Sequence, residues 1–145
     1  MRLLLHILTI GILFISPHLL SQDINSYNVN AILNVDNKTI EVKQIMSFKN
    51  TSSFQLNKIF LEDWSNSYIN NETKLARRIS DEYSRSFSFA QKRQRGFTTI
   101  NELKGNNIES WSRYNSQLDI IEVELNDSIK EGESISCLLY TSDAA

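Results

Sequence analysis

The sequence predicts an all-β protein, an antiparallel β-sandwich with one short helix inserted between its strands. Apolar and polar residues alternate in several short segments, turn-forming residues separate these segments at regular intervals, and one segment has apolar residues three or four apart. Six or seven short strands of this kind are typical of a sandwich. The 145 residues, 41% of them hydrophobic, suffice for the core of one domain.

The first 21 residues have the layout of a signal peptide. Arg2 precedes an apolar run at residues 3–15, and a break at Ser16-Pro17 follows. The run falls short of the roughly 20 residues that span a bilayer, so a permanent membrane anchor is the less favoured alternative. We expect cleavage after Ser21 and an exported product, periplasmic or secreted, with no attachment to a membrane.

Three strands are predicted after the signal peptide. Residues 27–34 alternate, with one face formed by Tyr27, Val29, Ala31 and Leu33. Asp36-Asn37 is a turn signal, and a second strand at Thr39–Lys49 completes a hairpin. A third apolar segment at 56–64 alternates less cleanly, which predicts that both of its faces are partly covered.

A change of period predicts a short helix between residues 70 and 83. Leu75, Ile79 and either Glu82 or Tyr83 form one apolar stripe, and Asn71 is the candidate N-cap. Arg77 and Arg78 would lie on the solvent side. The polar stretch at 84–95 has neither the two-residue period of a strand nor the period of a helix, which predicts a long loop.

Strands resume at 97–103, at Ile108–Tyr114 and at 117–125, with a turn at 104–107. Asn126-Asp127 begins another connection, and a last strand starts at Ser134. The predicted domain covers residues 22–136.

Residues 137–145, CLLYTSDAA, depart from the polar and β-rich composition of the preceding segment. They resemble a translated sequencing adapter. We expect them to be a non-native tail and the sandwich of 22–136 to be incomplete. The alternative is an ordinary last strand at 135–140. An incomplete sandwich leaves an unpaired edge and an uncovered apolar face, so we expect marginal folding or self-association.

The histidine distribution restricts the chemistry of the mature chain. His6 and His18 both lie in the predicted signal peptide, which excludes His-assisted nucleophiles and the commoner zinc sites downstream. Cys137 has no second cysteine with which to form an intramolecular disulfide. The formal charge of -2 gives no attraction to nucleic acid. We therefore expect no catalytic, cofactor-binding or metal-ligating residue in this chain.

Several charged clusters are candidate sites. Glu62 and Asp63 would point to opposite faces of a strand, which favours solvation or a structural ion pair. Glu122 and Glu124 share a face, but two carboxylates are too few ligands for calcium, which favours a wet sheet face. The basic run at 92–95, with phenylalanines nearby, is interpreted as a solvated interdomain loop and not as a nucleic-acid patch.

Trp64 and Trp111 were the aromatic candidates. The two tryptophans could form an aromatic platform for carbohydrate, but burial in the core is favoured because single tryptophans in sandwiches usually pack inside.

Four motifs together resemble the N-terminal domain of bacterial zinc metallopeptidases of the M1 family, which are aminopeptidase N-like. They are LEDWSNSY at 61–68, LARR at 75–78, RGFTTI at 95–100 and LNDSIKEGES at 125–134. The resemblance implies a saddle-like β domain that packs against a later catalytic domain and helps to wall its substrate cleft. The family motifs H-E-x-x-H and G-x-M-E-N are not in this chain.

The resemblance thus implies a non-catalytic scaffold and interface domain of an exported zinc aminopeptidase, a hydrolase that removes N-terminal residues from peptides. Zinc is expected in the missing catalytic domain, which would be the partner of this one and would supply its contact with peptide substrate. The alternative is a freestanding exported sandwich that binds a glycan or a protein.

Overall fold

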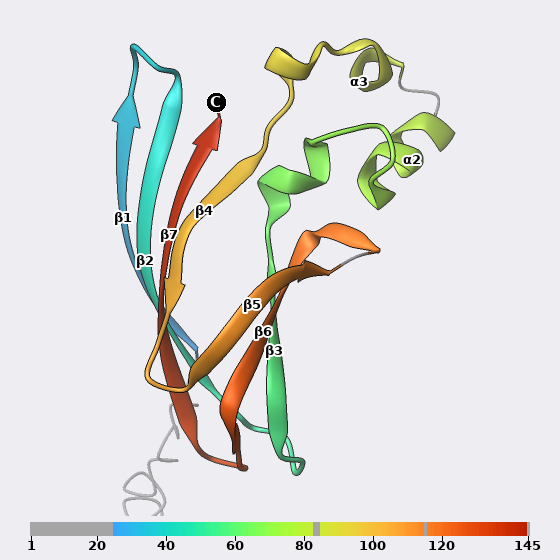
Figure 1. Cartoon of the computed structure of the whole chain (residues 1–145). Helices are drawn as coiled ribbons and strands as arrows, with labels where there is room; N and C mark the ends of the chain where they lie inside the picture. The colour runs from blue at the N-terminus through green and yellow to red at the C-terminus, as the bar shows by residue number, and fades with distance from the viewer. Residues whose placement is uncertain (1–24, 83–84, 115, 145) are drawn as a thin grey trace, which may run out of the picture.

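The computed structural model describes residues 25–82, 85–114 and 116–144 and confirms an all-β sandwich (Figure 1). Seven antiparallel strands form a four-stranded sheet in the order β1-β2-β7-β4 and a three-stranded sheet in the order β3-β6-β5. The predicted signal peptide, its cleavage site and Tyr83 lie outside the described residues. The strands are β1 Ser26–Asn34, β2 Thr39–Lys49, β3 Leu56–Glu62, β4 Thr98–Lys104, β5 Ile108–Tyr114, β6 Gln117–Ile129 and β7 Ser134–Ala144.

In the part of the chain that the structure describes, the helices all lie between β3 and β4. Two α-helices, α2 at Lys74–Asp81 and α3 at Ser86–Phe89, and two 3-10 turns, η1 at Trp64–Tyr68 and η2 at Lys92–Gln94, cluster at one end of the sandwich (Figure 1). The predicted helix is confirmed as α2, but the long loop predicted at 84–95 is wrong, because that stretch contains α3 and η2.

The hairpin β1–β2 follows from its turn chemistry. Nine residue pairs run without interruption from Ser26↔Ser47 to Asn34↔Thr39. The Asn34 side chain accepts a hydrogen bond from the backbone N–H of Asn37, and Lys38 takes a positive φ of 52°. These features close the turn that Asp36-Asn37 predicted.

The core lies between the sheets, around the middle of β6. Val123 and Ile121 are 0% and 2% exposed. Met46 on β2 and Leu139 on β7 are buried in the same cluster and belong to the opposite sheet. Cys137 is buried there too, and burial raises the pKa of its thiol.

Strand β6 is longer than predicted, and the connection expected at Asn126-Asp127 is wrong. Asn107, in the turn before β5, donates from its side-chain amide to the Asp127 carbonyl and accepts from the Asp127 backbone N–H, both at 2.8 Å. These side-chain bonds continue the pairing with β6 at the residue before the start of β5. On the other side Ile129 pairs with Leu56 of β3, so β6 stays extended to its end.

Residues 137–144 form most of β7, the strand between β2 and β4. Cys137, Leu139 and Thr141 are buried. A Cβ atom at Gly105 would lie 2.6 Å from the carbonyl oxygen of Ser136, so the turn between β4 and β5 passes directly against β7. The boundary at residue 136 and the non-native tail stay predictions, because the position of a segment in the fold does not establish its origin.

Candidate interface at the helical corner

The end of the sandwich that carries η1, α2, α3 and η2, which we call the helical corner, begins at a capped turn. The Asp63 carboxylate accepts from the backbone N–H of Asn66 and starts η1. Thr73 caps α2, since its hydroxyl oxygen accepts from the N–H of Ala76 at 3.2 Å. The predicted cap, Asn71, is wrong. The Thr73 hydroxyl also donates to the Ser67 carbonyl at 2.6 Å, which joins α2 to η1.

Buried polar contacts fix the corner to the three-stranded sheet. The guanidinium of Arg113 lies 2.7 Å from Oδ2 of Asp63, whose side chain is 5% exposed. Arg113 also donates to the backbone carbonyls of Leu118 and Thr98, both at 2.9 Å. One arginine thus joins η1, β4 and the start of β6, and it neutralises a carboxylate that burial would otherwise disfavour.

Aromatic rings connect the parts of the corner to one another. The Trp64 and Tyr68 rings meet edge to face at 6.2 Å, and the Tyr68 and Phe87 rings at 5.8 Å. The Arg95 guanidinium lies over the Phe87 ring, 5.1 Å from its centroid, and donates to the Ala90 carbonyl. Arg95 therefore serves the fold of the corner. The basic run that contains it lies partly in η2, so it is not a loop throughout.

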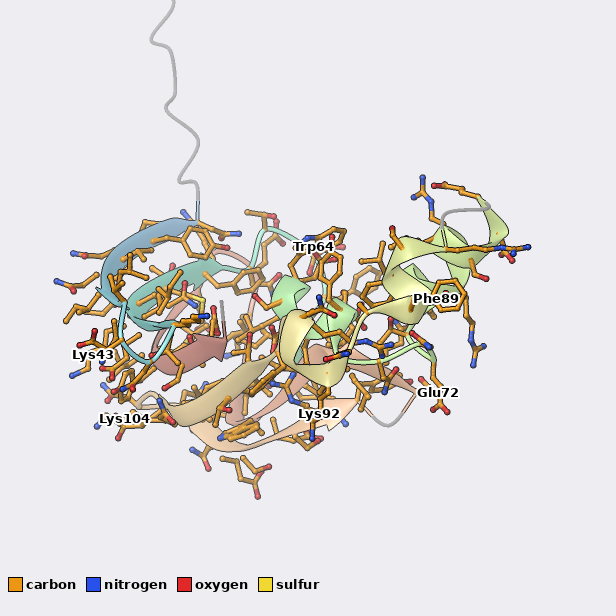
Figure 2. All side chains as sticks on the ribbon, turned by 90° about the horizontal axis from the view of Figure 1, so that it is seen from above. Lys43, Trp64, Glu72, Phe89, Lys92 and Lys104 are labelled. Carbon is orange, nitrogen blue, oxygen red and sulfur yellow. The ribbon has the colours of Figure 1, made fainter. Side chains whose placement is uncertain are left out.

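Two large aromatic side chains on this corner have little cover. Trp64 is 65% exposed and Phe89 is 78% exposed, and Arg77 and Lys92 are exposed as well. Figure 2, which looks down on this end of the molecule, shows Trp64, Phe89 and Lys92 distributed over it. Aromatic residues together with arginine are the side chains enriched in protein interfaces.

The expectation that both tryptophans are core residues is wrong. Trp64 lies just beyond the end of β3 and is 65% exposed, and Trp111 is 37% exposed on the edge strand β5. Nothing in the sequence distinguishes these positions, because an exposed and a buried tryptophan give the same local pattern. Phe87 and Phe89 are among the phenylalanines near the basic run, and their presence in a polar stretch is a usable signal in the sequence.

The acidic pairs have structural partners. Asp63 forms the ion pair with Arg113, and Glu62 is exposed. Glu122 and Glu124 lie on the outer face of β6, each 2.6 Å from the Lys58 ammonium on β3. Hydrogen bonds to Glu122 and then to Glu124 hold the pKa of Lys58 above its usual range. The shared sheet face is confirmed, and it carries a surface ion triad.

A small polar pocket of about 160 Å³ lies between the sheets beside Trp64. Asp63 and Asp143 both line it, with Thr98 and Thr141. Burial, with a smaller effect from the Asp63 carboxylate, raises the pKa of Asp143, while a hydrogen bond with Thr98 acts in the opposite direction. Within the described residues, no group of three or more His, Cys, Asp or Glu side chains is arranged to hold a metal ion.

The raised pKa predicts a pH-dependent penalty that Asp143→Asn removes. The folded state holds the Asp143 proton more tightly than the unfolded state, so this contribution to stability is present below about pH 3.8 and is lost as the pH rises through the raised pKa. We expect Asp143→Asn to stabilise the protein more at pH 7 than at pH 4, measured by urea unfolding. Asp36→Asn, in the exposed β1–β2 turn, is the control. An Asp143→Asn effect that is equal at both pH values would contradict the assignment.

Comparison of the chain with protein-family models, with curated proteins and with solved structures finds no match in any of the three. In the described ranges, no helix is long and apolar enough to cross a bilayer.

Proposed function

We propose that this chain is the non-catalytic N-terminal scaffold and interface domain of an exported zinc aminopeptidase of the M1 type, and that the helical corner is the surface that meets the catalytic domain. The supporting observation is spatial. Three of the motifs that carry the resemblance, at 61–68, 75–78 and 95–100, are separate segments of the stretch that joins β3 to β4, and all three contribute residues to the corner.

Contacts within the corner support this grouping. A Cβ atom at Gly96 would lie 3.4 Å from the Ser65 carbonyl oxygen and 3.9 Å from Cβ of Tyr68, so the third motif lies against the first. The second motif lies in α2, which the Thr73 hydroxyl joins to η1. The three motifs thus lie on one surface. The first motif contributes the exposed Trp64, and the exposed Phe89 lies between the second and third motifs in the sequence.

In this proposal the zinc and the residues that bind peptide belong to the downstream domain. This chain supplies a rigid wall, because the buried Asp63–Arg113 ion pair and the caps hold the corner on the sandwich. Signal-directed export places the assembly in the periplasm or outside the cell.

The decisive experiment is to sequence the source DNA beyond the codon for Ser136. The proposal expects the reading frame to continue into G-x-M-E-N and H-E-x-x-H, in place of the adapter-like residues 137–145. A natural stop after Ala145, or a continuation without these motifs, would overturn it.

A second measurement uses the chain as it is. We expect no hydrolysis of aminoacyl 4-nitroanilides by the purified chain, with or without added Zn²⁺, because it offers neither the ligands nor the general base of that chemistry. An authentic M1 aminopeptidase serves as the positive control. Turnover that co-purifies with the chain and is lost on unfolding would contradict the assignment of a non-catalytic role.

One observation favours a second candidate, a glycan-binding module. Trp64 is 65% exposed and borders the polar pocket lined by Asp63 and Asp143, and a stacking ring beside carboxylate acceptors suits a sugar. This candidate predicts that oligosaccharides quench tryptophan fluorescence, that Trp64→Ala abolishes the effect and that Trp111→Ala preserves it. Absence of quenching across a panel of plant, bacterial and animal glycans would exclude it.

A further inference from the structure

The two sheets have four free edges, and three of them carry features that hinder pairing with another strand. Strands β3, β4 and β5 each contain register shifts. Each also contains charged residues, such as Lys58 on β3, Lys104 on β4 and Arg113 on β5. Bulges and charges are the means by which natural sheets prevent association through their edges.

Strand β1 has none of these protections. Its nine residues, SYNVNAILN, include no charge and no proline, and its pairing with β2 runs without a bulge. Among the described residues β1 pairs with β2 alone, and every residue of β1 except Asn34 is exposed. Figure 1 shows β1 on the outside of its sheet, on the far side of β2 from β7.

The inner face of β1, which is the face on the core side of its sheet, is apolar and largely exposed. Tyr27 pairs with the buried Met46, so Tyr27, Val29 and Leu33 share the inner face. They are nevertheless 64%, 55% and 62% exposed. The four-stranded sheet has one strand more than the sheet opposite, and Val29 and Leu33 on the inner face of β1 stay largely exposed. Tyr27, near the start of β1, borders a hollow of about 460 Å³ that Leu56 and Ile59 of β3 also line.

We propose that β1 is a homotypic pairing edge, at which a second copy of this chain adds its own β1 in antiparallel orientation about a two-fold axis through Asn30. Full overlap of Ser26–Asn34 with itself puts Tyr27 opposite Leu33 and Val29 opposite Ala31 on the inner face. On the outer face Asn28 lies opposite Ile32, and Asn30 lies opposite its own copy. Apolar residues thus meet apolar residues along the inner face, and no charge opposes another.

The occupant is a second copy and not the chain's own leader. Cleavage after Ser21 would leave only residues 22–24 before Asn25, too few to pair along nine residues. In this register β1 matches a second copy of itself in length, and no charge opposes another.

The contact is small. Nine residues in a strand extend about 30 Å, and a single strip of that length falls well below the roughly 800 Å² per partner of a standard interface. We therefore infer a weak, reversible and concentration-dependent dimer.

The test is sedimentation equilibrium of the full chain and two charge variants, Asn30→Lys and Asn30→Glu. The two-fold axis opposes like charges in each variant, which should weaken self-association by at least roughly tenfold. A one-to-one mixture of the two variants should associate again, because Lys then faces Glu. If both variants lose self-association and their mixture does not regain it, the two-fold pairing is overturned.

The matched control is Thr99→Lys, which adds the same charge at an exposed position on β4, the opposite edge of the same sheet. It should dimerise like the parent chain. Equal weakening by Thr99→Lys, or a monomeric parent at all concentrations, would overturn the proposal. Because Asn30 lies opposite Lys43 on β2, thermal unfolding of each variant checks that the fold is kept.

Disulfide formation tests the register independently. In Asn30→Cys the two new cysteines are directly opposed, with Cα atoms about 4.5–5.5 Å apart, within reach of a disulfide. In Asn28→Cys they are separated along the strands by about 13 Å, beyond reach. Mild oxidation should crosslink the first variant and not the second, and the reverse result would exclude this register. None of these readouts depends on enzymatic activity or on the proposed function.

Discussion

Replacing Ile121 by alanine is expected to lower the free energy of unfolding by about 2–5 kcal/mol. Ile121 is 2% exposed and lies in the core formed by β6 and the facing residues of β2 and β7. Removal of three carbon atoms loses their burial and leaves a cavity that close-packed strands fill only in part. Chemical denaturation monitored by tryptophan fluorescence measures the change.

The control for this variant is Val35→Ala, in the β1–β2 turn, where the side chain is 73% exposed. It should change the free energy of unfolding by less than about 0.5 kcal/mol. If the two variants have equal effects, Ile121 is not in a packed core and the arrangement of the two sheets is wrong.

The second large effect is expected at Asn50, a polar residue that is 1% exposed. Its side-chain amide donates to the carbonyls of Phe54 and Ile129, at 2.7 and 3.0 Å, and its side-chain oxygen accepts from the backbone and hydroxyl of Ser52. Asn50→Ala removes these four hydrogen bonds from a buried junction, where only the bond from the Ser52 hydroxyl to the Phe54 carbonyl remains among them, and should lower the free energy of unfolding by on the order of 3 kcal/mol.

Asn57→Ala is the matched control for Asn50, because Asn57 is exposed on β3. Its effect should stay within about 0.5 kcal/mol. Hydrogen exchange gives a second measure: Asn50→Ala should expose the backbone amides of Gly132 and Asn50, which bond across the same junction. Protection that is unchanged there would contradict the role assigned to Asn50.

The strands with strong alternation were predicted well from the sequence. The bounds of β2 and β5 agree with the prediction, and β1 differs by one residue at its start. Alternation succeeds here because one face of each strand differs in polarity from the other. The helix α2 was found by its spacing, although its cap was not, since Asn71 and Thr73 are both good caps and only the fold selects between them.

Features that depend on distant residues were not predicted. The extension of β6 beyond Leu125 requires Asn107, which lies in another turn and pairs with Asp127. The buried network of Asn50 joins the connection after β2 to the end of β6, and in the sequence Asn50 resembles any polar residue of a turn. Exposure of Trp64 depends on which strands lie opposite it, which no local pattern records.

For the candidate sites, the sequence correctly placed Glu122 and Glu124 on one face and allowed for an ion pair at Asp63. It did not identify Lys58 or Arg113 as the partners, because both pairs join different strands. For the helical corner, the sequence offered only three separate motifs that carry the resemblance. That these motifs lie together could be seen only from the fold.

The position of β7 has a consequence for the order of events during synthesis. It emerges from the ribosome after the six other strands, yet it lies between β2 and β4, and Thr39 pairs with Ala144. Until β7 arrives, the hairpin at the front of the chain and β4 have no hydrogen-bonded connection within their sheet. Closure then depends on contacts between distant parts of the chain, which form slowly. Until that closure the strands of the four-stranded sheet expose unpaired edges and apolar faces, so the nascent chain needs protection from aggregation.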